Sequence, residues 1–314
     1  MMINISKAVQ LLKENNSFII LSHQNPDGDT IGGAFALAFA LKKLGKKVRC
    51  ECENSVPNKF EFLTNDFVPD ESDNAYIVSV DVADEKLLGD TLSEKYHGKV
   101  SLSIDHHLSH REFSSFTLVE NRAAACEIVF EVIEHLGIRI DRKIADCLYV
   151  GIATDTGCFR YTNTEASTHI IAGKLIEYGA DHNSINTRIF ETKTKTYAAL
   201  ERLALSSLEM HFDGRCALMC VTTEMFKQSG SDETECDGIS ALPRQIEGVL
   251  VGVTVRQKTE NEYKISVRTN EPVDACEICS KLGGGGHIRA SGCTVNGTID
   301  EVKKIILDTV KESL

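Results

Sequence analysis

Three short segments of this chain are largely apolar, and each leads into an acidic residue. They are residues 17–21, 75–80 and 100–104, and the acidic residues are Asp27, Asp81 and Asp105. Strands that are apolar on both faces are typical of a parallel sheet covered by helices on either side. A helical pattern over 30–44 follows the first segment, which indicates βαβ units. We therefore expect an α/β fold with a mostly parallel sheet flanked by helices.

The acidic residues after these strands are candidates for one shared site. Ligands of open parallel sheets bind beyond the carboxyl ends of the strands, so Asp27, Asp81 and Asp105 are expected to converge. Taken alone, Asp27-Gly28-Asp29 would indicate only a turn. The full set of acidic and imidazole side chains is His23, Asp27, Asp29, Asp81, Asp105, His106, His107 and Asp155. Such oxygen ligands with some nitrogen suit Mn²⁺-type ions, and two ions about 3.5–4 Å apart can promote attack on phosphate esters.

The composition limits the class of protein. The chain has 314 residues with ordinary apolar and charged fractions, which indicates a globular protein of about two domains. No apolar run is long enough for a membrane span, and residues 1–14 do not resemble a secretion signal, so a cytoplasmic protein is expected. The net charge of −12 argues against binding along long duplex nucleic acid, which requires a broad basic track. Short nucleotides at a metal site are compatible with this charge.

The sequence pattern changes near residue 208. Short predicted strands with turns, followed by two helices, indicate a second and smaller α/β domain. We expect a metal-binding catalytic domain over 1–190, a connecting helix or linker over 191–207, and a substrate-binding domain over 208–314. Motion through the linker is expected to open and close a cleft for the substrate.

A glycine run near the C-terminus indicates how a phosphate could be held. Four aspartates balance two divalent cations, so a phosphate requires further positive charge. Gly283–Gly286 can bring backbone N–H groups close to a phosphate because glycine has no Cβ. Arg268 and His287 can supply positive charge. The alternative, a flexible loop, is disfavoured because His287 and Arg289 follow directly.

The chain has eleven cysteines, an odd and scattered set. We expect them to be reduced and mostly buried as small apolar side chains. Cys276 and Cys279 have zinc-finger spacing, but a structural zinc needs four ligands and no second pair is present. A zinc site and a reversible disulfide are the alternatives at this pair. His110 and the other histidines outside the candidate sites are expected to be solvated or structural.

Together these motifs resemble the DHH phosphoesterase superfamily. The matching residues are His23-x3-Asp27-x-Asp29, Asp81, Asp105-His106-His107 and Asp155-Thr156-Gly157. The glycine run with His287 and the segment 289–293 resembles the signature of the DHHA1 domain. The combination is similar to the compact NrnA type of DHH/DHHA1 protein, an oligoribonuclease (nano-RNase) and phosphatase of 3′-phosphoadenosine 5′-phosphate (pAp). The resemblance covers nearly the whole chain.

This resemblance implies a two-metal phosphodiesterase and phosphatase that cleaves short oligoribonucleotides to mononucleotides and pAp to AMP. Mn²⁺ is the expected ion, with Mg²⁺ or Co²⁺ as alternatives, and a hydroxide between the ions would attack. The implied ligands are His23, Asp27 and Asp81 for one ion and Asp29, Asp81, His106 and Asp155 for the other. The implied catalytic residues are Asp81, Asp105, His106 and His107, with Asp105 orienting an imidazole and His107 facing the phosphate. The implied substrate-binding residues are Arg268, Gly284, Gly285, Gly286, His287 and Arg289.

Several alternatives stay open at this point. Linear or cyclic dinucleotide signals such as pGpG or c-di-AMP would be hydrolysed by the same chemistry. A non-catalytic nucleotide-binding module is disfavoured because all the expected metal ligands are present. The sequence does not decide the preferred substrate, the cleavage polarity or the choice between a monomer and a homodimer.

Overall fold

The chain forms two compact units, Met1–Thr192 and Lys193–Leu314. The computed structural model describes residues 1–71, 74–236 and 238–314. No helix in these ranges is both long enough and apolar enough to cross a membrane. Each unit is built around its own sheet, and each is described separately below.

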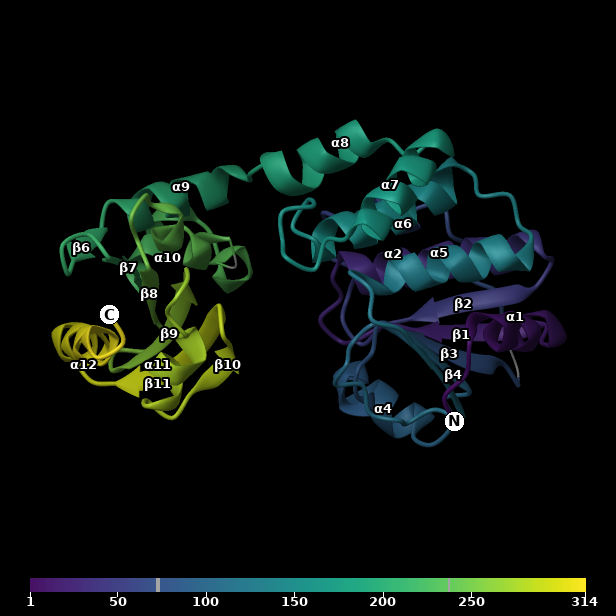
Figure 1. Ribbon diagram of the computed structural model, residues 1–314, viewed down its shortest axis with the longest axis horizontal. Coiled ribbons are helices and arrows are strands. Elements are labelled where there is room, and N and C mark those ends of the chain that lie inside the picture. The colour runs from purple at the N-terminus through teal and green to yellow at the C-terminus, as the bar shows by residue number, and fades with distance from the viewer. Residues whose placement is uncertain (72–73, 237) are drawn as a thin grey trace. The chain divides into compact units, whose positions relative to one another are not determined.

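The first unit contains a five-stranded parallel sheet in the order β2-β1-β3-β4-β5 (Figure 1). Its strands are β1 (Ser17–Leu21), β2 (Lys47–Glu51), β3 (Tyr76–Val80), β4 (Leu102–Asp105) and β5 (Phe116–Val119). The predicted parallel sheet flanked by helices is confirmed. Sequence reasoning missed β5, a four-residue edge strand with only two buried positions, which is too short to show a clear pattern.

Helices cover both faces of this sheet, with α2 and α5 on one face and α4 on the other (Figure 1). The helical segments are α1 (Ile5–Glu14), α2 (Gly28–Lys43), α3 (Glu61–Thr64), η1 (Glu85–Leu88), α4 (Asp90–Tyr96), α5 (Ala125–Leu136), α6 (Arg142–Asp155), α7 (Ala166–Glu177), α8 (His182–Asn186) and η2 (Thr187–Glu191). The central helix α2 begins at Gly28 and is capped by Asp27, whose side chain accepts hydrogen bonds from the N–H groups of Asp29 and Thr30. This cap satisfies two donors at the helix start. The cap therefore fixes the positions of Asp27 and Asp29 at the edge of the sheet.

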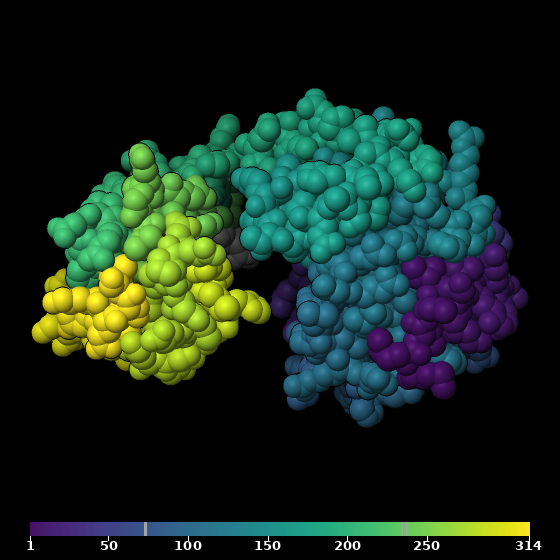
Figure 2. All heavy atoms as spheres, in the orientation of Figure 1, coloured from purple at the N-terminus to yellow at the C-terminus, as the bar shows by residue number. Residues whose placement is uncertain are grey.

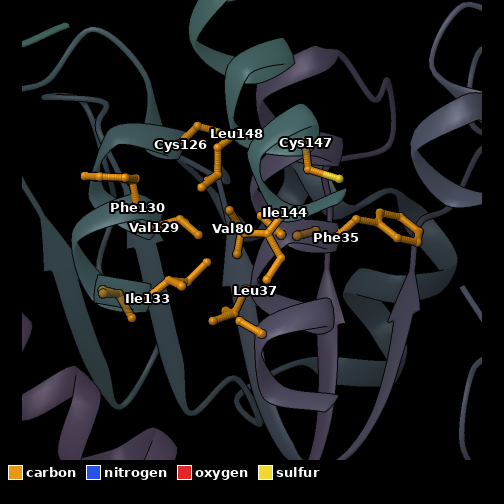
Figure 3. Close-up of a cluster of buried hydrophobic side chains, with 14 of the residues drawn as sticks. Phe35, Leu37, Val80, Cys126, Val129, Phe130, Ile133, Ile144, Cys147 and Leu148 are labelled. Carbon is orange, nitrogen blue, oxygen red and sulfur yellow. The ribbon is translucent and has the colours of Figure 1, made fainter. Parts of the chain in front are cut away.

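Helix α2 packs closely on α6, α5 and β3 because its glycines leave room for neighbouring atoms. A Cβ built on Gly32 would lie 2.3 Å from the backbone oxygen of Cys147, and one on Gly33 would lie 2.7 Å from Val80 Cγ1. Figure 3 shows Val80, Cys126 and Cys147 within this core. All eleven cysteines are free thiols, seven of them buried. Two of these thiols thus serve as small packing groups around the start of α2.

The second unit contains a six-stranded sheet in the order β10-β11-β9-β8-β7-β6, in which only β7 and β8 are parallel. Its strands are β6 (Glu209–His211), β7 (Cys216–Val221), β8 (Val251–Gln257), β9 (Glu262–Thr269), β10 (Gly285–His287) and β11 (Ala290–Asn296). Its helical segments are α9 (Lys195–Leu205), α10 (Thr223–Ser229), η3 (Glu233–Cys236), η4 (Ile239–Ala241), η5 (Pro243–Gln245), α11 (Ala275–Ser280) and α12 (Ile299–Lys311). Part of the glycine run thus forms an edge strand.

The core of the second unit lies between the sheet and helices α11 and α12. Alternate residues of β9 point into it, among them Ile265 and Val267. The residues between them, such as Ser266 and Arg268, face the other side of the sheet. Helix α9 packs on β7 through Leu200 and Ala204. The polar side of β9 is therefore available to line a cavity.

The N-terminal segment lies beside the edge strand β5. Met2 forms a parallel bridge with Thr117, and the amino group of Met1 lies 3.4 Å from Glu112 Oε2. The space-filling view shows this segment in purple on the surface of the first unit (Figure 2). These contacts partly cover the open edge of β5.

Candidate active site

The first candidate ligand group lies at the start of α2 and the end of β3. His23 Nε2 is 3.6 Å from Asp27 Oδ1 and 3.7 Å from Asp81 Oδ2. Ligand atoms of these three residues all lie within 4.8 Å of one another. The sequence-predicted set His23, Asp27 and Asp81 is thus brought together by the fold.

The second candidate group contains Asp29, His106 and Asp155, whose ligand atoms also lie within 4.8 Å of one another. His106 Nε2 is 3.2 Å from Asp155 Oδ2 and 3.8 Å from Asp29 Oδ2. Asp29 is fully buried, and its two oxygens accept hydrogen bonds from the backbone N–H groups of Ala125 and Cys126 at 2.6 and 2.9 Å. These donors belong to the first turn of α5, where a negative charge is stabilised.

Asp81 connects the two groups. Its Oδ1 is 3.5 Å from His106 Nε2, while its Oδ2 faces His23. Its backbone has φ 58°, a left-handed conformation that non-glycine residues rarely adopt. The Asp81 N–H donates to Ile104 O at 2.9 Å, which ties this conformation to the neighbouring strand. Backbone strain of this kind is typical of residues whose side chain must be aimed at a site.

Asp105 is buried and accepts hydrogen bonds from the residues that follow it. Its Oδ1 accepts from the His106 N–H at 2.8 Å and lies 2.8 Å from His107 Nδ1, while its Oδ2 lies 2.6 Å from His110 Nδ1. Burial alone would raise the pKa of Asp105, but the hydrogen bonds from His107 and His110 hold it well below its usual range. In turn, the bond to Asp105 raises the pKa of His107. His110 is thus a structural histidine that contacts the site directly.

The orientation of His106 leaves one ring nitrogen for a ligand. His106 Nδ1 lies 3.1 Å from the Arg122 carbonyl oxygen, which can only accept, so Nδ1 carries a proton and the neutral ring would offer the Nε2 lone pair to a ligand. Thirteen buried side-chain atoms of the described residues lack a hydrogen bond of ordinary geometry, and two of them, His106 Nε2 and Asp81 Oδ1, lie 3.5 Å apart at this site. Buried polar atoms are almost always partnered. These two atoms are therefore candidates to bind a ligand other than a protein hydrogen-bond partner.

The charges at the site support a cation as that partner. Burial, with the nearby charge of Asp81, raises the pKa of Asp29 to about 7. Burial and the charges of Asp29 and Asp81 raise the pKa of Asp155 to about 9. Carboxylates this close repel one another unless a positive charge lies between them. Two hard divalent ions fit both this charge and this donor set.

A cavity of about 290 Å³ opens over this cluster. It is lined by His23, Gln24, Asn25, Asp27, Asp81, Ala83, Leu87, His107 and Asp155. Gln24, Asn25 and Leu87 were not predicted from the sequence. The first two lie in the polar loop after β1, so their closeness to His23 was a usable signal. Leu87 comes from η1, and no pattern in the sequence placed it here.

The predicted substrate-binding residues all lie in the second unit. Arg268 and Gly285 line a cavity of about 400 Å³ together with Lys264 and Ser266, two residues that the sequence reading missed. His287 is exposed at the end of β10. Arg289 instead donates to Val273 O at 2.8 Å and lies 3.3 Å from Glu271 Oε1. It therefore anchors the β10–β11 hairpin.

Comparison with known proteins identifies the family. Residues 17–152 match the DHH family, N-terminal domain, and residues 217–314 match the DHHA1 domain. The bifunctional oligoribonuclease and PAP phosphatase NrnA of Thermus thermophilus is 32% identical over 302 residues, covering 94% of this chain and 89% of that protein. This chain belongs to the DHH/DHHA1 family. The resemblance inferred from the motifs is thus confirmed, and the chain is a DHH-family phosphohydrolase.

Other members of the DHH/DHHA1 family match over nearly the same length. The bifunctional oligoribonuclease and PAP phosphatase NrnA of Bacillus subtilis is 23% identical over 314 residues, covering 96% of each chain. The crystal structure of an exopolyphosphatase-related protein from Bacteroides fragilis has a TM-score of 0.87 at 25% identity, covering 98% of this chain and 95% of that one.

Proposed function

We propose that this phosphohydrolase uses two divalent cations to cleave short oligoribonucleotides to mononucleotides and pAp to AMP. The observation that carries the proposal is the pair of ligand groups that Asp81 connects, since one of its oxygens faces His23 and the other faces His106. The names of the relatives in Thermus thermophilus and Bacillus subtilis support this substrate class. The cavity of about 290 Å³ over the cluster supports a small substrate, because ligand pockets for small molecules start near about 300 Å³.

We propose that His23, Asp27 and Asp81 hold one cation, and that Asp29, Asp81, His106 and Asp155 hold the other. Mn²⁺ is the expected ion, with Mg²⁺ or Co²⁺ as alternatives. When bound, such a pair lowers the pKa of water and stabilises negative charge on the reacting phosphate. Asp29 is kept in place by the N-terminus of α5 and His106 by the Arg122 carbonyl.

His107 is proposed to face the phosphate. Its side chain is 44% exposed and lines the cavity, and its raised pKa favours the positively charged imidazolium. Asp105 orients it through the 2.8 Å contact with Nδ1. In the second unit, we propose that Arg268, Gly284–Gly286 and His287 bind a phosphate of the substrate. Arg289 would support them by anchoring the hairpin.

The test is a substrate panel with the purified protein and MnCl₂. A dinucleotide should give mononucleotides, pAp should give AMP, and Asp81→Ala should abolish both. Asp66→Ala is the charge-matched control, because Asp66 is 81% exposed and pairs only with Lys143 among the ion pairs of the described residues. Turnover by Asp81→Ala at the parent rate would contradict the proposal. Adding pGpG, c-di-AMP and long RNA to the panel decides among the substrate classes.

A further inference from the structure

Two thiols of the second unit form a pair that the sequence spacing did not predict. Cys279 near the end of α11 is fully buried and Cys293 of β11 is 6% exposed, and both belong to the core of this unit. Helix α11 packs on β11, which brings the Cys279 side chain within interaction range of Cys293. Cys276, the partner suggested by the spacing, instead has its Sγ 3.8 Å from Ser280 Oγ. The fold thus selects Cys293 as the thiol that faces Cys279.

This thiol pair lies directly against the glycine run. The Gly284 N–H donates to Cys279 O at 2.9 Å. A Cβ built on Gly284 would lie only 2.5 Å from Cys293 Cβ. The backbone at Gly284 is therefore packed against both cysteines, and a change in the distance between the two sulfur atoms must shift this backbone.

The surroundings make Cys279 a reactive thiol. The contact with Cys293 lowers the pKa of Cys279, with help from Ser291 and the charge of Arg268. This direction favours the thiolate, which is the form that reacts with oxidants. Helix α11 packs on β10, an exposed three-residue edge strand, and opening of this short edge element would give an oxidant access to Cys279.

We propose that Cys279 and Cys293 form a reversible disulfide when a peroxide oxidises them, and that this bond weakens substrate binding at the glycine run. The Cys279 thiolate attacks one peroxide oxygen, the O–O bond breaks, and a sulfenic acid and hydroxide form. Cys293 sulfur then displaces the hydroxyl group. In total, two thiols and one H₂O₂ give one disulfide and two waters, and a dithiol reductant reverses the reaction. The effect on binding rests on the proposed function, whereas the disulfide does not.

The disulfide is tested by mass spectrometry on the full chain. The metal-free protein is treated with H₂O₂, its remaining thiols are blocked with N-ethylmaleimide, and it is digested. A cross-linked peptide pair containing Cys279 and Cys293 should appear and should disappear after reduction with dithiothreitol. Cys279→Ser and Cys293→Ser should lose it, and Cys276→Ser should retain it. A Cys276–Cys279 link, or no link at all, would overturn the proposal.

The effect on binding is tested after the peroxide is removed and MnCl₂ is added. In the parent and in Cys276→Ser, oxidation should raise KM for a dinucleotide at least threefold while kcat changes less, and dithiothreitol should restore it. Cys279→Ser and Cys293→Ser should show no such change. An unchanged KM in the cross-linked protein would overturn the effect on binding. Absence of turnover in the reduced parent would contradict the proposed function, while the peptide masses alone would still decide the disulfide.

Discussion

Replacing Gly32 with alanine tests whether the contact between α2 and α6 is as close as the structure indicates. The new Cβ would lie 2.3 Å from Cys147 O and 3.2 Å from Gly151 N. Both are backbone atoms, so no rotamer change relieves the clash and the helices must separate. Overpacking of this kind costs about 1–3 kcal/mol, and a backbone clash favours the upper end. The higher helix propensity of alanine returns about 1 kcal/mol. We therefore expect a net loss of about 2 kcal/mol.

Gly173→Ala is the matched control for this substitution. Gly173 is an exposed residue of helix α7, and a Cβ there would meet no atom within 4 Å. The same change should stabilise the protein by about 0.5–1 kcal/mol. Urea unfolding followed by circular dichroism measures both values. Gly32→Ala should also lose activity, because Asp29 and Asp155 are carried by the two helices that separate. A Gly32→Ala protein as stable as Gly173→Ala would refute this description of the core.

Three further outcomes are expected. His110→Ala should lower kcat by about 10–100-fold, because Asp105 loses the hydrogen bond from His110. His110→Asn should recover part of the lost activity by giving Asp105 a new donor. Equal kcat values for His110→Ala and the parent would show that this hydrogen bond does not support catalysis. Chelation with EDTA should lower Tm, and MnCl₂ should restore it. At a free Mn²⁺ concentration of about one hundred times Kd, binding should raise the free energy of unfolding by about 2.7 kcal/mol. An unchanged Tm would contradict metal binding. In the metal-free protein, burial raises the pKa of Asp29 to about 7 and that of Asp155 to about 9. Stability should therefore fall as pH rises from about 4 to about 9, because the folded protein holds these protons more tightly than the unfolded chain. Urea unfolding across this pH range should show that slope, and MnCl₂ should remove it.

The sequence predicted most of the first unit because its signals are local and strong. The apolar run 17–21 coincides with β1, and its ending in a polar loop placed His23 and Asp27 correctly at the sheet edge. The convergence of Asp27, Asp81 and Asp105 also followed, since parallel strands bring their carboxyl ends to one edge. Asp155 comes from the end of helix α6, and it was placed at the site by the family resemblance. The roles of these residues in binding metal and substrate remain predictions.

Features that depend on distant contacts were not predictable from the sequence. Spacing along the chain indicated Cys276 and Cys279 only as an alternative pair, whereas the packing of α11 on β11 brings Cys293 close to Cys279. Nothing in the sequence distinguished His110 from the other histidines, but in the fold the turn after β4 places its Nδ1 beside Asp105. In both cases the deciding contact is set by how two elements pack, and a single amino-acid sequence carries little information about that packing.

The charge distribution implies an order of binding. Around Asp81 the candidate site presents closely spaced carboxylates, so the positive charge that attracts a phosphate there would come mainly from bound cations. In the second unit, the cavity that contains Lys264 and Arg268 is basic within a chain of net charge −12, so it attracts a phosphate without any metal. A phosphate analogue should therefore bind the metal-free protein weakly, through Arg268, and bind more tightly once MnCl₂ is added. Calorimetry on the parent and on Arg268→Ala separates the two contributions, and equal affinity with and without MnCl₂ would contradict this order.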